Sequence, residues 1–324
     1  MDPFSNFDIS AEQLRIFSLF HPRAFKRTAS AITSNQRLVH YTSANTALKI
    51  IKNEAVWARN SSCMNDFMEL EYGLECLTSS LAVHRERYIE VFDNIFDGFT
   101  AELTQYFNDW LPTIRSDTYI TCLSEHLATE DTLGRLSMWR AYGGQTGVAF
   151  VVSGKPFLTP SDALNAYTSP VEYLSRSQFE QEFIQFIESI QGNATWVKSL
   201  GRDTVKAYMF AALRFAMLCT KHPGFHEERE WRVIYSPKYE HSKKITIDVE
   251  SIGGTPQKVC KIPLKDIPEE GLTGIEVPSL LDRIIIGPTQ YPVEMREAFI
   301  DVLEKAGVAE AEQKVIISDI PLRT

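Results

Sequence analysis

The sequence has few cysteines and no pair of them at the short spacing typical of metal or redox motifs. Its 324 residues include five Cys, at positions 63, 76, 122, 219 and 260, and none of them forms a CxxC pair. An odd number of thiols and an N-terminus without a secretory pattern exclude a disulfide scaffold. We therefore expect reduced thiols and a cytoplasmic protein.

Long apolar runs and excess positive charge are also missing. The longest apolar stretch, Ala207 to Cys219, is interrupted by Arg214 and is too short to span a bilayer, so no membrane partner is expected. With 33 Lys and Arg against 42 Asp and Glu, the net charge is −9, which argues against a dedicated non-specific DNA binder. The hydrophobic share of 44% is ordinary for a globular protein with a sizeable core.

The sequence has none of four common catalytic motifs: GxGxxG, GxxxxGK[ST], HExxH and GxSxG. Their absence disfavours dinucleotide-binding and phosphate-binding glycine loops, zinc proteases of the HExxH type and α/β-hydrolases.

The pattern of apolar residues predicts an α+β fold. Strands are expected at 37–42, 56–58, 118–124, 147–152, 171–173, 230–235, 244–249, 258–262, 283–286 and 314–317. Helices are expected at 11–20, 44–52 (capped by Ser43), 66–111, 131–142, 178–190, 194–220 and 294–306. Because strands and helices do not alternate regularly, we predict a mixed, split β-sheet rather than a doubly wound one. The predicted domains are an N-terminal helical extension, 1–36, and a single domain, 37–324, with helical insertions near 66–112 and 176–220.

Two candidate sites lie in the first quarter of the chain. His40, Tyr41 and Thr42 end a predicted strand, where a neutral imidazole could accept a hydrogen bond from a ligand hydroxyl; a structural histidine bonded to backbone is the alternative. Asp66 and Glu69 could share a helix face and hold a cation, but their spacing also suits a helix cap.

Two further patterns follow later in the chain. Trp139 and Tyr142 are three residues apart on a predicted helix and could form one aromatic wall, or simply pack in the core. In the strand at 230–235, residues two apart face the same side, so Glu228, Glu230 and Arg232 would share one face and Trp231, Val233 and Tyr235 the other. The alternative is that the charged residues lie on a solvent-exposed strand edge and form ion pairs with one another.

Taken in order, these motifs resemble a prokaryotic domain-of-unknown-function family, number 2971. The motifs that carry the resemblance, over roughly residues 37 to 290, are His40 to Thr42, Asn65-Asp66 with Glu69, Cys122-Leu123-Ser124, Trp139 to Tyr142, Gly147 to Phe150, Glu228 to Arg232 and Ile284 to Pro288. Their layout in turn looks like that of the ADP-ribosyltransferase superfamily, in which a split sheet clamps NAD.

That resemblance implies a set of roles. His40 and Thr42, with the neighbouring Tyr41, would contact the NAD ribose, and Ser124 and Tyr142, with Trp139, would shape the nicotinamide pocket. Glu230 would be catalytic, and Glu228 would orient or deprotonate the acceptor. The cluster carries no predicted metal. Here Cys-Leu-Ser stands where the superfamily has Ser-Thr-Ser, and about 100 residues separate it from the acidic pair, a longer interval than in compact toxin members.

The predicted function is therefore an ADP-ribosyltransferase-like enzyme that uses NAD as substrate and modifies a protein or nucleic acid, in the setting of a toxin or anti-phage defence effector. With water as acceptor it would be an NAD glycohydrolase. The alternatives are a Mg²⁺-dependent nuclease or hydrolase using Asp66, Glu69, Glu228 and Glu230, and a non-enzymatic module that binds a nucleotide or partner. The acidic charge favours a protein or small-molecule acceptor. The alternative is a nucleic-acid acceptor bound by a local basic patch, whose members would be Lys221, Arg229, Arg232, Lys238, Lys243 and Lys244.

Overall fold

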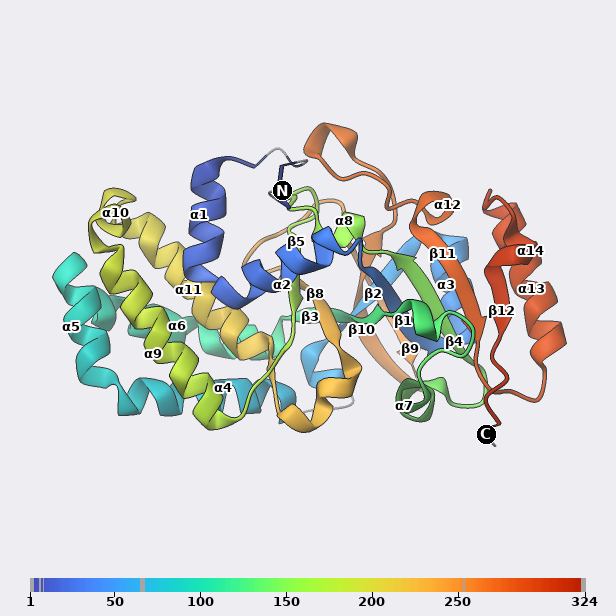
Figure 1. Ribbon diagram of the computed structural model, residues 1–324, viewed down its shortest axis with the longest axis horizontal. Helices are drawn as coiled ribbons and strands as arrows, with labels where there is room; N and C mark the ends of the chain where they lie inside the picture. The colour runs from blue at the N-terminus through green and yellow to red at the C-terminus, as the bar shows by residue number, and fades with distance from the viewer. Residues whose placement is uncertain (1–2, 6, 8, 65–67, 253, 322–324) are drawn as a thin grey trace.

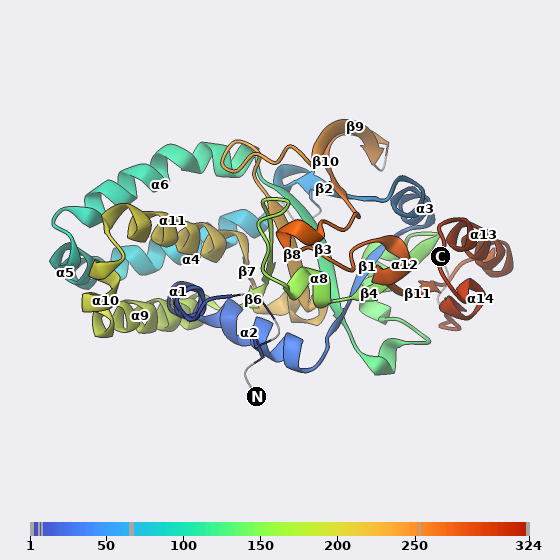
Figure 2. The same cartoon turned by 90° about the horizontal axis from the view of Figure 1, so that it is seen from above.

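The computed structural model describes residues 3–5, 7, 9–64, 68–252 and 254–321. A group of helices forms one end of the molecule and a large β-sheet the other, with the two N-terminal helices beside the junction (Figure 1). Seen from above, the helical end and the sheet lie next to each other rather than in stacked layers (Figure 2).

The main sheet is open and mixed, and it has ten strands within the described residues. Eight follow the order β12-β11-β4-β1-β3-β2-β10-β9, and β8 with β5 branches from β3. The bounds are β1 (Arg37–Ser43), β2 (Ala55–Asn60), β3 (Tyr119–His126), β4 (Gly147–Ser153), β5 (Ala166–Pro170), β8 (Glu230–Tyr235), β9 (Thr246–Ile252), β10 (Thr255–Pro263), β11 (Leu281–Ile286) and β12 (Val315–Ile317). β11 and β12 run parallel, and the other pairs are antiparallel.

Strand β3 lies at a fork in this sheet. One of its edges pairs with β8 from Tyr119 to Ser124. The other edge is shared, because β2 pairs with Tyr119 and Ile120 whereas β1 pairs with Ser124 onwards. Residues 121–123 therefore lie where β1 and β2 separate, and polar groups there need other partners.

The helical end contains the two segments predicted as insertions. Its helices are α4 (Met68–Val83), α5 (Arg85–Ile95), α6 (Phe99–Ser116), α9 (Arg176–Gly192), α10 (Ala194–Ser199) and α11 (Arg202–Leu218). Ser175 caps α9 with Gln178 in a reciprocal pair of hydrogen bonds. These helices enclose an apolar core of their own, to which α1 (Ala11–Phe20) contributes Leu19 and Phe20.

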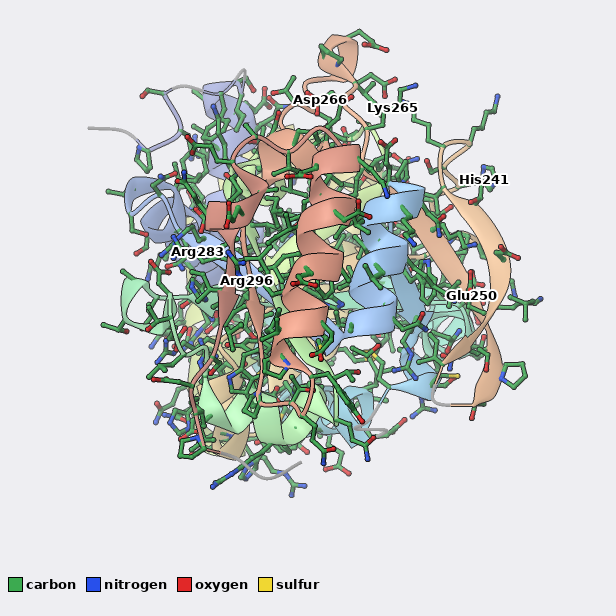
Figure 3. All side chains as sticks on the ribbon, turned by 90° about the vertical axis from the view of Figure 1, so that its right-hand side faces the viewer. His241, Glu250, Lys265, Asp266, Arg283 and Arg296 are labelled. Carbon is green, nitrogen blue, oxygen red and sulfur yellow. The ribbon has the colours of Figure 1, made fainter. Side chains whose placement is uncertain are left out.

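A second apolar core lies between the sheet and the helices that cover the part of it away from the helical end. α3 (Ala44–Asn53) and α13 (Pro292–Lys305) lie side by side on that face (Figure 3). Ser43 caps α3 by accepting a hydrogen bond from the Thr46 amide, as predicted. The remaining elements are α2 (Pro22–Thr33), α7 (Leu136–Met138), α8 (Lys155–Leu158), α12 (Val277–Leu280), α14 (Ala311–Lys314) and a small parallel sheet of β6 (Glu172–Tyr173) and β7 (Thr220–Lys221).

The α+β class with a mixed sheet is confirmed, whereas four details of the predicted helices are wrong. The helix expected at 194–220 is divided into α10 and α11, and α2 was not predicted. The helix expected at 131–142 is replaced by the short α7 and a π-type turn at Trp139–Gly143. The long helical stretch after residue 66 is divided into three helices by His84 and by Gly98, whose φ of 67° belongs to the left-handed region. Within the residues that the structure describes, no helix combines the length and the apolar character that a membrane crossing requires.

Candidate active site

Four charged side chains form a compact cluster at the start of β8, here called the carboxylate cluster: Lys221, Glu228, Glu230 and Arg232. The Lys221 ammonium lies 2.6 Å from Glu228 Oε2 and 2.9 Å from Glu230 Oε2. Arg232 Nε donates to Glu230 Oε1 at 2.9 Å. The prediction that one strand face carries both carboxylates is wrong, because β8 begins only at Glu230 and Arg229 has a φ of 45°. A shared lysine brings the two carboxylates together instead.

Glu230 is the buried member of the pair. Its residue is 4% exposed, and both carboxylate oxygens are engaged by Lys221 and Arg232. Burial on its own raises the pKa of this carboxyl, but the charges of Arg232 and Lys221, with a hydrogen bond from Cys122, lower it to about 2. Glu230 is therefore an ionised carboxylate whose charge is compensated within the protein.

Glu228 is the more accessible carboxylate. Its side chain is 18% exposed, and Tyr142 donates a hydrogen bond to its Oε1 at 3.1 Å. Arg135 fixes the backbone here, because its Nη1 donates to the carbonyl oxygens of Glu227 and Glu228 at 2.7 and 3.2 Å. Burial and the charge of Glu228 raise the pKa of Tyr142, so its hydroxyl stays protonated and remains a donor.

His40 belongs to β1 and lies at the fork, where β1 and β2 separate along β3. Its Nδ1 is 2.8 Å from the carbonyl oxygen of Cys122. A carbonyl only accepts, so Nδ1 carries the proton and Nε2 is left as the basic nitrogen. Burial lowers the pKa of His40, which keeps the ring neutral near pH 7. The contact with backbone is the one expected of a structural histidine, and it also orients Nε2 as an acceptor.

Cys122 connects the two ends of the predicted site. Its carbonyl oxygen accepts a hydrogen bond from His40, and its side chain is hydrogen-bonded to Glu230. Ser124, two residues further along β3, stands directly opposite Glu230 in the β3–β8 register and is buried. Strand β3 thus contacts His40 and places Ser124 opposite Glu230, whereas Tyr142 contacts Glu228.

Tyr41 and Trp139 are buried and pack against each other. Their rings meet edge to face with centroids 4.9 Å apart, and Trp139 is 2% exposed. Tyr41 Oη accepts from the Arg135 amide at 2.8 Å, and Trp139 Nε1 donates to the Leu133 carbonyl at 2.8 Å. The predicted wall of Trp139 with Tyr142 is wrong, since the π-type turn changes the three-residue geometry and leaves Tyr142 36% exposed. Thr42 is partly buried opposite Val148 of β4.

The metal-binding alternative draws no support from these contacts. Asp66 lies outside the described residues, and the Glu69 side chain is likewise not described. Both remaining carboxylates, Glu228 and Glu230, bind Lys221. Across the described parts of the chain, no three His, Cys, Asp or Glu side chains are grouped as a metal site.

The basic patch suggested by sequence spacing is not formed as expected. Lys221 and Arg232 are 2% and 1% exposed and pair with the carboxylates. Lys244 pairs with Glu270. Of the six residues of the predicted patch, these three are therefore engaged in ion pairs, whereas Lys238 and Lys243 are exposed.

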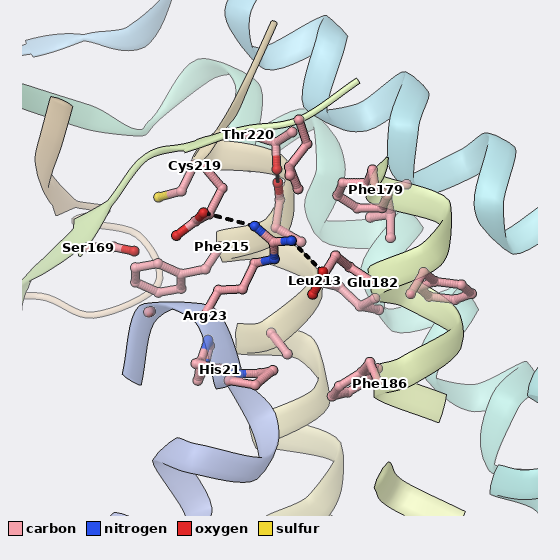
Figure 4. Close-up of a pocket in the computed structure, with 18 of the residues that line it drawn as sticks. His21, Arg23, Ser169, Phe179, Glu182, Phe186, Leu213, Phe215, Cys219 and Thr220 are labelled. Atoms are coloured by element: carbon pink, nitrogen blue, oxygen red, sulfur yellow. Dashed lines mark hydrogen bonds and ion pairs between the residues drawn. The ribbon is translucent and has the colours of Figure 1, made fainter. Parts of the chain in front are cut away.

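Two cavities are found elsewhere in the molecule. The smaller, of about 150 Å³, lies between α2, α9 and α11, and Arg23 bridges Glu172 and Glu182 inside it (Figure 4). The larger, of about 850 Å³, lies between α1, α2, α11 and the β5–β8 side of the sheet. Neither of these two is lined by a residue of the predicted site.

Sequence analysis missed Tyr173 and Arg135, which shape the carboxylate cluster, and assigned Lys221 to a basic patch instead. Tyr173 Oη accepts from the Glu230 amide at 2.8 Å, Arg135 holds the segment before β8, and Lys221 joins the carboxylates. Lys221 follows a run of apolar residues and precedes a His-Pro-Gly turn. Because a lysine buried in such a place needs an acidic partner, its position in the sequence was a signal for this ion pair. No local pattern identifies Arg135 or Tyr173.

Comparison with known proteins gives one family match. Residues 138–233 match the model of a family described as a protein of unknown function, DUF2971. The matched segment covers Trp139, Tyr142 and the whole carboxylate cluster, and it supports the family resemblance of the sequence motifs. No curated protein and no solved structure matches the chain.

Proposed function

We propose that this chain is an ADP-ribosyltransferase-like enzyme that cleaves NAD at the nicotinamide–ribose bond and transfers ADP-ribose to a protein or nucleic-acid acceptor. One observation carries the proposal. His40 on β1 and Glu230 on β8 come from distant parts of the sequence, yet both contact Cys122 at the fork of the sheet.

The neutral His40 suits the binding of a sugar. With Nδ1 bonded to the Cys122 carbonyl, Nε2 can accept a hydrogen bond from a ribose hydroxyl. A charged imidazolium could not accept this bond. The lowered pKa of His40 therefore favours the proposed contact.

In this proposal the carboxylates have different roles. Loss of nicotinamide leaves an oxocarbenium-like ribose, which a nearby carboxylate stabilises. Glu228 is the carboxylate that ligands can reach, so we assign it the contact with the ribose. Glu230, which the resemblance made catalytic, instead positions Lys221 and thereby Glu228. The predicted role of Glu228 toward the acceptor is replaced by this contact.

Nicotinamide release from NAD by the full chain tests the proposal. We expect Glu228→Gln to lower turnover about 100-fold, because a neutral amide no longer stabilises the developing charge. Glu227→Gln is the matched control, since Glu227 is the exposed neighbour of Glu228. This variant should release nicotinamide at the wild-type rate. Equal turnover in the Glu228 and Glu227 variants, or no nicotinamide release with any acceptor class, contradicts the proposal.

Transfer and hydrolysis are separated by the acceptor. Nicotinamide release in buffer alone indicates water as the acceptor, whereas release only with added protein, RNA or DNA identifies the acceptor class. Labelled ADP-ribose on that macromolecule establishes transfer. The effector role in toxin action or phage defence stays a prediction.

A further inference from the structure

A buried arginine forms part of the lining of the larger cavity. Arg214 of α11 lines this hollow of about 850 Å³ and is 3% exposed. Its Nη2 donates to Ser236 Oγ at 3.0 Å. Within the described part of the chain this is its one hydrogen bond, and no carboxylate there reaches ion-pair distance.

The aromatic neighbours of Arg214 compensate its charge only in part. The guanidinium carbon lies 4.9 Å from the ring centroid of Tyr239 and 5.6 Å from that of Phe215. Such cation–π contacts are weaker than an ion pair in a desolvated site. A guanidinium has five N–H donors in a fixed fork, and the hydrogen bond to Ser236 uses one of them.

The rest of the lining is chiefly apolar and comes from several elements. The α1 and α2 helices cover one side, and Figure 1 shows them beside β5 and α11. The apolar side chains that line the hollow include Leu14, Phe17, Leu164, Trp231, Val233 and Ile262. A hollow of this size and character lies within the range of small-molecule sites.

Acidic side chains in the same hollow disfavour a ligand with more than one negative charge. Asp162, Glu240 and Glu270 also line it. Lys244 pairs with Glu270. Burial raises the pKa of Glu240, the nearby charge of Arg214 lowers it in part, and Glu240 in turn partly compensates the charge of Arg214. These carboxyls oppose a doubly charged phosphate more strongly than a singly charged carboxylate.

We propose that this hollow binds a monocarboxylate with an apolar body, its carboxylate on the Arg214 guanidinium and its chain along the apolar lining. The site is distinct from the carboxylate cluster. Trp231 and Val233 line the hollow, whereas Glu230 and Arg232 alternate with them along β8 and face the other side. Binding here therefore does not depend on NAD cleavage.

Calorimetric titration of the full chain with dodecanoate tests the proposal. We expect dodecanoate to bind the wild-type chain. Dodecanol should bind it with about 30-fold lower affinity, and dodecanoate should bind the Arg214→Met variant with about 30-fold lower affinity, because each change removes a charge-assisted hydrogen bond. Dodecyl phosphate should bind more weakly than dodecanoate. No binding of dodecanoate, equal affinity for the alcohol, or tighter binding of the phosphate overturns the proposal.

A second variant keeps the test decisive if Arg214→Met does not fold. Ala211 lines the hollow, whereas its neighbour Ala212 lines the smaller cavity. Ala211→Leu should weaken dodecanoate binding at least about tenfold by occupying space, and Ala212→Leu should leave it unchanged. Unchanged binding in Ala211→Leu overturns the proposal.

Discussion

The hydroxyl of Tyr142 donates a 3.1 Å hydrogen bond to Oε1 of Glu228, which joins the π-type turn after α7 to the segment before β8. The two residues are far apart in the sequence, and Lys221 holds the other oxygen of the same carboxylate. Glu228 is thus fixed from two sides while its side chain stays partly exposed. A carboxylate held in this way is pre-organised for a ligand.

Removing the Tyr142 hydroxyl should therefore reduce activity with little effect on stability. Tyr142→Phe is expected to lower kcat/KM for nicotinamide release about tenfold, through the loss of one hydrogen bond to a charged group. The melting temperature should change little, because Tyr142 is only partly buried and the substitution keeps its ring. Tyr291→Phe is the matched control, since Tyr291 is exposed and lies after β11. Unaltered kcat/KM in Tyr142→Phe would remove this tyrosine from the site.

Glu230 should contribute stability that depends on pH. Its pKa in the folded protein is about 2, below the ordinary value of 4.5, so the folded state favours the ionised form. The contribution is complete above about pH 4.5 and is lost as the pH falls toward 2, because the unfolded chain takes up the proton first. Urea unfolding at a series of pH values measures this loss.

The variant Glu230→Gln isolates that contribution. At pH 7 it should lower the free energy of unfolding by about 3 kcal/mol, because Lys221 and Arg232 remain buried without their shared anion. The difference from the wild type should shrink as the pH decreases from 4.5 to 2. A difference that stays constant over this range would show that the charge of Glu230 does not stabilise the fold.

The close contact between α4 and α11 gives a prediction about stability alone. A Cβ on Gly73 would lie 2.1 Å from the carbonyl oxygen of Met217, a backbone atom that cannot move without shifting α11. Gly73→Ala should therefore lower the free energy of unfolding by about 2 kcal/mol or more. Gly192→Ala, at the end of α9 with open space around it, is the control and should be neutral or better. Equal stability of the two variants would contradict the close helix packing.

Local patterns predicted much of the secondary structure because they depend on neighbouring residues. The alternation at 230–235 predicted that Trp231, Val233 and Tyr235 face a core, and all three belong to the core of the sheet. The Ser43 cap was predicted for the same reason. The strand β5 was missed because its sequence, Ala166–Pro170, is polar and short, and its pairing with β8 decides its conformation.

The α+β class and most strands follow from local sequence patterns, because periodicity and capping act over a few residues. Which charged side chains pair with one another depends on the folded chain. The fold buried Lys221 between two carboxylates, divided the edge of β3 between β1 and β2, and placed His40 against Cys122 at that fork. The physical reason is that ion pairing and strand register join residues distant in the chain, and no local pattern encodes which of them become neighbours.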